Sequence, residues 1–121
     1  MKVSEYQIQC AFFDQIRMMA NSEPRLRWCY GYMANSAGNV KVAVKHKKLG
    51  QLKGVWDIFL REKNPKEPYS CGLYIEMKKK GENLTKEQKE FQASAPYGYY
   101  FAVCYSAEEG VSAVKNYLGL K

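Results

Sequence analysis

The chain has 121 residues and a formal net charge of +7, and 46% of its residues are hydrophobic, which is too apolar for a disordered chain. This length fits one domain, so we predict a single folded unit over residues 1–121. No apolar run reaches the roughly 18 residues of a membrane helix, and the first residues lack the apolar stretch of a signal peptide. We therefore expect a cytoplasmic protein without membrane contact, whose positive charge favours a polyanionic partner.

The four cysteines are dispersed along the chain, as Cys10, Cys29, Cys71 and Cys104. They form no C-x-x-C pair, and His46 is the single histidine of the chain. A zinc site needs closely spaced Cys and His ligands. We predict reduced thiols in the core rather than disulfides or a zinc site.

Three segments begin with a hydroxyl residue that is followed three positions later by Gln or Glu. They start at Ser4, Thr85 and Ser106, and apolar residues at helical spacing follow each of them. In this pattern, the capping box, the two side chains satisfy backbone N–H groups at the start of a helix. The sequence therefore predicts three helices that begin at these positions.

Four apolar or alternating segments predict strands, over residues 26–33, 55–61, 73–79 and 99–105. The predicted order is αβββαβα. A central mixed sheet flanked by helices, an α/β fold, is the natural arrangement for this order.

Glu76 and Lys78 form an E-x-K pattern on the third predicted strand. Residues two apart on a strand point to the same face, so these two side chains project together. Glu87 and Lys89 repeat the pattern on a predicted helix, where positions two apart diverge. Only the first copy can act as a unit.

Asp57 is placed by the turn at residues 64–68, which would join the second and third strands as a hairpin. A register without a bulge sets Asp57 opposite Glu76, with Cβ atoms about 4.5–5.5 Å apart. Two carboxylates this close repel unless a cation lies between them. Hard oxygen ligands favour Mg²⁺ or Mn²⁺, and Lys78 on the same face can stabilise the charge of a phosphoryl transition state.

Three further groups are candidates for the same site. The backbone carbonyl of Met77 can serve as an extra oxygen ligand, and Glu5 on the first helix can complete a second metal site. Gln9 lies one turn further along the same helix face as Glu5.

Each of these residues also has a simpler explanation when it is taken alone. Glu76 and Lys78 can form a solvated ion pair worth under about 1 kcal/mol. Glu5 is favourable beside a helix N-terminus, and Gln88 suits a capping box. The joint arrangement of Asp57 and Glu76 across one turn is what favours a site.

A basic segment at residues 41–54 leads directly into Asp57. A solvated charged loop is the usual explanation of such a run, but here its charge would lie beside the proposed metal site. Lysines at phosphates give affinity that does not depend on base sequence. His46 fits a phosphate contact or a bystander better than a general base. The residues that we expect to contact DNA are Asn35, Lys41, Lys45, His46, Lys47, Lys48 and Lys53.

These residues and their spacing resemble the stand-alone VRR-NUC proteins, the virus-type replication-repair nuclease branch of the PD-(D/E)XK superfamily. The resemblance covers nearly the whole chain. The matching residues are Ser4-Glu5, Gln7, Gln9, Asn35, Gly50, Gly54 to Ile58, Leu73 to Lys78 and Leu84 to Lys89.

The resemblance implies a restriction-endonuclease-like core and DNA cleavage that depends on Mg²⁺ or Mn²⁺, with no organic cofactor. It assigns Asp57 and Glu76 as metal ligands and Lys78 as the partner of the attacking water or the transition state. It also assigns Glu5 as the carboxylate that the first helix contributes to the site. Gln88 carries over as a supporting residue.

One position departs from the family pattern, because Trp56 replaces the proline that usually precedes the metal-binding aspartate. Proline is not a ligand, so the chemistry should survive, while the local backbone path changes. Short stand-alone members resemble phage-encoded homodimers that act on branched DNA such as four-way (Holliday) junctions. Two symmetric cuts need two sites, which a dimer supplies.

The leading hypothesis is therefore a structure-selective DNA endonuclease. A second enzymatic hypothesis is a less selective nuclease or a flap-end exonuclease with the same site. A hypothesis of another class is a non-catalytic DNA-binding module with a nuclease-like fold.

Overall fold

A computed structural model of the chain describes residues 3–31, 48, 50 and 52–121. Within these residues the order of α-helices and strands is helix, three strands, helix, strand, helix, as the sequence predicted. None of the described helices is long and apolar enough to cross a membrane.

Helix α1 (Glu5–Met19) begins with the predicted capping box. The Ser4 side chain accepts from the Gln7 backbone N–H, and the Gln7 side chain accepts from the Ser4 N–H. The buried face of the helix includes Ile8, Phe12 and Ile16, which recur at helical spacing. This face places α1 against the sheet.

The four strands of the described residues form one mixed sheet in the order β1-β2-β3-β4. They are β1 (Cys29–Gly31), β2 (Ile58–Leu60), β3 (Gly72–Met77) and β4 (Tyr99–Cys104). The first two pairings are antiparallel, and β3 pairs with β4 in parallel. The parallel connection contains helix α3 (Lys86–Ala93), as parallel strands need a crossover.

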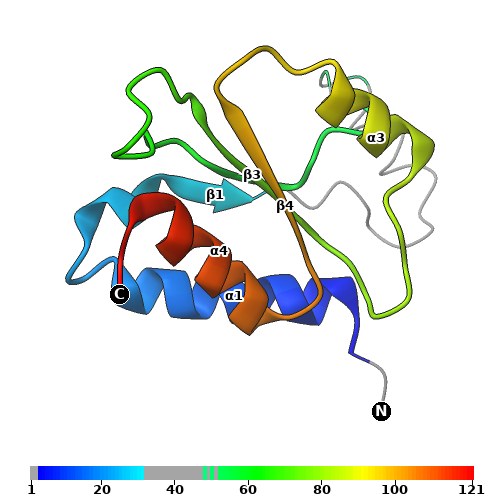
Figure 1. Cartoon of the computed structure of the whole chain (residues 1–121). Helices are drawn as coiled ribbons and strands as arrows, with labels where there is room; N and C mark the ends of the chain where they lie inside the picture. Colours follow the sequence, from blue (N-terminus) through cyan, green and yellow to red (C-terminus); the bar gives the residue numbers. More distant parts are fainter. Residues whose placement is uncertain (1–2, 32–47, 49, 51) are drawn as a thin grey trace.

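The molecule has three layers, with helices on both sides of the sheet (Figure 1). Helix α1 and helix α4 (Ala107–Leu118) pack against each other and cover one face, whereas α3 lies over the other. The core lies between the sheet and the helix pair. It is built mainly from Ile8, Phe12, Ile16, Ile58, Leu60, Leu73, Ile75, Met77, Val111, Val114 and Leu118.

The structure corrects three local expectations. Residues 24–28 form a short 3-10 helix, η1 (Pro24–Trp28), so the first strand begins only at Cys29. Pro24 occupies the first turn, where its fixed φ favours a helical start. The Ser106 cap is one-sided, because the Glu109 carboxylate accepts from the Tyr105 N–H instead of from Ser106.

The third correction concerns the cysteines. All four are free thiols, as predicted, and Cys29 and Cys104 are buried. Cys10 and Cys71 are exposed, so the expectation of four core thiols is wrong for two of them. Cys10 lies on the outer face of α1, and Cys71 directly precedes β3.

Candidate active site

The predicted hairpin register between β2 and β3 is confirmed. Ile58 pairs with Ile75, Phe59 with Tyr74 and Leu60 with Leu73. Continuing this register by one residue places Asp57 opposite Glu76. Because side chains alternate along a strand, Asp57, Glu76 and Lys78 share the sheet face opposite the α1–α4 pair.

Glu76 is the most deeply buried acidic residue among the described residues, with 1% of its surface exposed. Its Oε1 accepts from the Asp57 backbone N–H at 3.1 Å. Its Oε2 accepts from the Gln88 side-chain amide at 2.9 Å and lies 3.9 Å from Lys78 Nζ. Both carboxylate oxygens are therefore fixed, one by the sheet and one by α3.

Helix α3 supplies Gln88, and the capping box at its start explains how this side chain is aimed. The Thr85 side chain accepts from the Gln88 N–H, and Gln88 Oε1 accepts from the Thr85 N–H. The amide oxygen of Gln88 thus faces the helix start, which leaves its Nε2 to donate to Glu76. One side chain completes the cap and supports the carboxylate.

Trp56 adds a second link between this helix and the residues before β2. Its indole Nε1 donates to the Gln88 carbonyl at 3.0 Å. Its ring packs edge-on against Phe101 with centroids 4.9 Å apart. Directly before Asp57, this chain therefore has a buried indole that holds α3.

Both central carboxyl groups have raised pKa values. Burial raises the pKa of Asp57 to about 6, against the attraction of Lys78. Burial, followed by repulsion from Asp57, raises the pKa of Glu76 to about 7, against the Asp57 N–H and Lys78. The site holds two acidic groups but one amine, so its positive charge does not balance its negative charge when both carboxyl groups are ionised. Such an excess of negative charge away from solvent is typical of sites that bind a cation.

Glu5 lies close enough to this site to sense its charges. Burial first, and then a hydrogen bond with Glu82, raises the pKa of Glu5; Lys78 lowers it and Asp57 raises it. The Glu5 carboxyl group thus belongs to the same electrostatic cluster. Sequence reasoning missed Glu82, which follows β3 and forms an ion pair with Lys79 at 3.2 Å. Glu82 lies in a turn and not on a helix, so its spacing from Lys79 was no signal for the site.

The donor chemistry of the site fits a hard divalent cation. Asp57, Glu76 and Glu5 offer carboxylate oxygens, and Met77 lies between Glu76 and Lys78 with a backbone carbonyl. No three His, Cys, Asp or Glu side chains converge into a ready-made metal cluster within the described residues. The chain therefore provides a carboxylate pair with Glu5 nearby rather than a closed cage.

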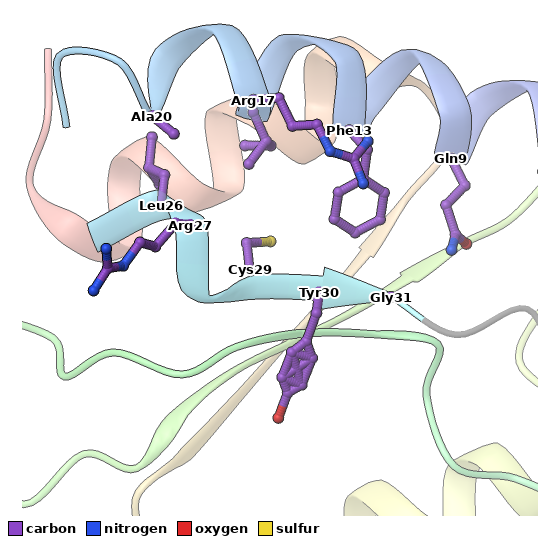
Figure 2. Close-up of a pocket in the computed structure, with 10 residues that line it drawn as sticks. Gln9, Phe13, Arg17, Ala20, Leu26, Arg27, Cys29, Tyr30 and Gly31 are labelled. Carbon is purple, nitrogen blue, oxygen red and sulfur yellow. The ribbon is translucent and has the colours of Figure 1, made fainter. Parts of the chain in front are cut away.

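Gln9 lies one turn after Glu5 on α1. It is buried and lines a groove of about 510 Å³ between α1 and β1. A Cβ atom added to Gly31 would lie 2.8 Å from Gln9 Nε2. Figure 2 shows its side chain directed toward the Gly31 end of this groove.

The predicted DNA contacts can be followed only in part. Lys48 is exposed, and Lys53 forms an exposed ion pair with Glu87 at 3.5 Å. The others lie outside the described residues; they are Asn35, Lys41, Lys45, His46 and Lys47.

The mixed sheet with helices on both faces is the predicted α/β arrangement and is consistent with a restriction-endonuclease-like fold. More narrowly, the chain has the fold of a VRR-NUC domain. A solved structure titled "VRR_NUC domain protein" superposes with a TM-score of 0.62 at 20% sequence identity. The superposition covers 100% of this chain and 93% of that chain. No protein-family model and no curated protein matches the sequence.

Proposed function

We propose that this protein is a divalent-metal-dependent deoxyribonuclease, an endonuclease that selects branched DNA such as four-way junctions. The observation that carries the proposal is the pair of the buried Glu76 and the half-buried Asp57, set opposite each other with Lys78 on the same face. The VRR-NUC fold and the basic composition support it.

The proposed roles follow from the chemistry of each side chain. Asp57, Glu76 and Glu5, with the Met77 carbonyl, would hold Mg²⁺ or Mn²⁺. When bound, this cation supplies Lewis acidity to the phosphodiester and to the attacking water. Lys78 neutralises charge that develops on the phosphoryl oxygens.

The remaining residues hold the site or the substrate. Gln88 keeps the Glu76 carboxylate in one orientation through its 2.9 Å hydrogen bond. Lys48 and Lys53 of the basic segment would contact the phosphate backbone of the DNA. Their contacts would be insensitive to base sequence and weakened by salt.

A homodimer in the cytoplasm completes the proposal. Cutting a four-way junction at two symmetric positions requires two sites related by a two-fold axis. A single chain of 121 residues has little surface with which to grip all arms of a junction.

The test compares four-way junction, flap and linear duplex DNA side by side, with Mg²⁺, Mn²⁺ or EDTA. The wild type should cut the junction in either metal and not in EDTA, whereas Asp57→Asn should bind DNA without cutting it. Preferential trimming of flap ends would favour the exonuclease hypothesis. Binding without cleavage in every metal would instead favour a non-catalytic DNA-binding module.

A further inference from the structure

A row of aromatic side chains crosses the sheet beside the carboxylate pair. Each strand contributes one member at paired register positions, and the row consists of Tyr30, Phe59, Tyr74 and Phe101. Neighbouring ring centroids are 6.0, 4.5 and 5.5 Å apart along the row. Phe59 is two residues from Asp57, and Tyr74 is two residues from Glu76. The row and the carboxylates therefore share a face, about 7 Å apart along the strands.

One end of the row is covered and the other is open. Phe91 of α3 packs edge-on against Tyr74, with centroids 5.0 Å apart. At the β1 end, Tyr30 is 51% exposed and Trp28 is 41% exposed. Figure 2 shows Tyr30 on the opposite side of β1 from Cys29, directed away from α1. Aromatic surface is thus accessible at the open end.

Gly72 lets this surface continue from β2 to β4. A Cβ atom at Gly72 would lie 2.3 Å from the Phe59 ring, so the ring occupies the space of a side chain. Tyr99 pairs with Gly72 in the register, and its ring lies 6.2 Å from that of Phe59. The absence of a side chain at Gly72 keeps the two half-buried rings adjacent.

Positive charge borders the open end. The Arg61 guanidinium lies 4.3 Å from the centroid of the Trp28 ring, and that of Arg27 lies 4.9 Å from it. Neither guanidinium forms an ion pair with a carboxylate of the described residues. Both are therefore available to an anionic partner such as a phosphate.

We propose that these residues form a platform that stacks unpaired nucleobases of the DNA strand that is cut. The aromatic platform consists of Trp28, Tyr30, Phe59 and Tyr99 with Arg27 and Arg61. It rests on the proposed nuclease function, because the occupant is the strand whose phosphodiester enters the carboxylate site. Efficient cleavage would then require that the bases beside the cut are unpaired in the DNA or become unpaired when the protein binds.

The chemistry of the platform favours a single strand over a duplex. Exposed rings bind the faces of unpaired bases without regard to sequence, and guanidinium groups pair with the accompanying phosphates. In a continuous duplex the base faces are already covered by their neighbours. A flap supplies free base faces next to a phosphodiester, and a branch point interrupts the stacking of the base pairs beside it.

Binding can be tested separately from cleavage in the Asp57→Asn protein, with a 12-nucleotide single strand that contains 2-aminopurine and with its duplex. Tyr30→Leu in that background should weaken binding of the single strand about tenfold, or about 1.4 kcal/mol. It should also remove the stacking-induced quenching of 2-aminopurine and leave duplex binding unchanged. Tyr30→Trp should restore both signals.

Tyr6→Leu is the matched control, because Tyr6 is 62% exposed on α1, on the other side of the sheet. Equal single-strand affinity of Tyr30→Leu and Tyr6→Leu would overturn the platform. If Tyr30→Leu does not fold, cross-links from a 5-bromouracil strand to the Asp57→Asn protein decide the matter. Cross-links at Trp28 or Tyr30 support the platform, and cross-links found only elsewhere refute it.

The binding test and the cleavage test can fail separately. A protein that stacks single strands but cuts no DNA would refute the nuclease proposal alone. A protein that cuts junctions but shows no dependence on Tyr30 would refute the platform alone.

Discussion

Gln88 donates its side-chain amide to Glu76 Oε2 at 2.9 Å, and this hydrogen bond joins α3 to the centre of the sheet. The same side chain accepts from the Thr85 N–H at the helix start. The orientation of a buried carboxylate therefore depends on how a helix on the outer layer begins. Two substitutions separate these roles.

Gln88→Ala should reduce metal-dependent cleavage by tenfold or more, because loss of a hydrogen bond behind a metal-binding group typically costs 10- to 100-fold. Thr85→Ala is the control, since it removes the other half of the cap without touching Glu76. Each variant should lose about 1 kcal/mol of stability. Thermal unfolding and single-turnover cleavage would measure the two effects. Equal losses of activity in both variants would contradict a specific role for Gln88.

Trp56→Phe tests the hydrogen bond that links the residue before Asp57 to α3. The variant keeps an aromatic ring against Phe101 but loses the 3.0 Å donation to the Gln88 carbonyl. The loss of one hydrogen bond should lower the free energy of unfolding by about 1 kcal/mol. Because α3 is then held less firmly, cleavage should fall. The fall should be smaller than in Gln88→Ala, because the hydrogen bond from Gln88 to Glu76 is still present. Urea unfolding with parallel cleavage assays would show this order, and a variant as inactive as Gln88→Ala would contradict it.

Local signals predicted much of this site. The alternation around Glu76 and the position of the turn at residues 64–68 were enough to predict which residues oppose each other. Both depend only on the two-residue period of a strand and on the length of a hairpin. The capping boxes at Ser4 and Thr85 were equally local, and both formed.

What the sequence did not reveal depends on contacts across the fold. The hydrogen bond from Trp56 to Gln88 spans 32 residues, and no pattern in the sequence indicates it. Residues 26–28 have strand-like composition, yet the proline at the start of η1 favours a helical turn. The resemblance assigned Gln88 a supporting role, but no local pattern indicated that its Nε2 donates to Glu76 while its Oε1 caps α3.

Asp57→Asn should stabilise the metal-free protein while abolishing cleavage. Burial opposes the charged form of Asp57, and its repulsion also raises the pKa of Glu76. A neutral amide of the same size removes both costs. At pH 8 without metal, the variant should be more stable by about 1 kcal/mol, a value discounted for the partial exposure of Asp57. Thermal unfolding in EDTA measures this, and a less stable variant would contradict the electrostatic argument.

Stability of the metal-free protein should depend on pH through the same carboxyl groups. The folded pKa values of about 6 for Asp57 and about 7 for Glu76 exceed the ordinary values of 3.8 and 4.5. Between about pH 4 and pH 7 the folded state therefore binds more protons than the unfolded state. The contribution of these groups to the free energy of unfolding falls as pH rises through this window.

Added Mg²⁺ should reverse this trend, because the cation binds the deprotonated carboxylates. The increase in melting temperature on adding Mg²⁺ should be small at pH 5.5 and larger at pH 8. Asp57→Asn serves as the control and should show little increase at either pH. An increase that is equal at both pH values would indicate that Mg²⁺ binds somewhere other than this pair.

Gly54 fixes how closely the segment before Asp57 approaches α3. Its φ is +97°, and a Cβ atom there would lie 2.6 Å from the Glu87 carbonyl oxygen. Gly50 has a similar φ of +94°, but a Cβ atom there would have no heavy atom of the described residues within 4 Å. Both substitutions to alanine incur the backbone strain of about 1 kcal/mol, and only Gly54→Ala adds a clash with backbone atoms.

Gly54→Ala should therefore lose more stability than Gly50→Ala and should also lose cleavage activity, because α3 carries the Gln88 amide that orients Glu76. Gly50→Ala should lose about 1 kcal/mol and keep its activity. Urea unfolding and cleavage of a four-way junction would be measured for both variants. If the two variants behaved alike, the close packing of this segment on the first turn of α3 would not be what holds Asp57 and Glu76 together.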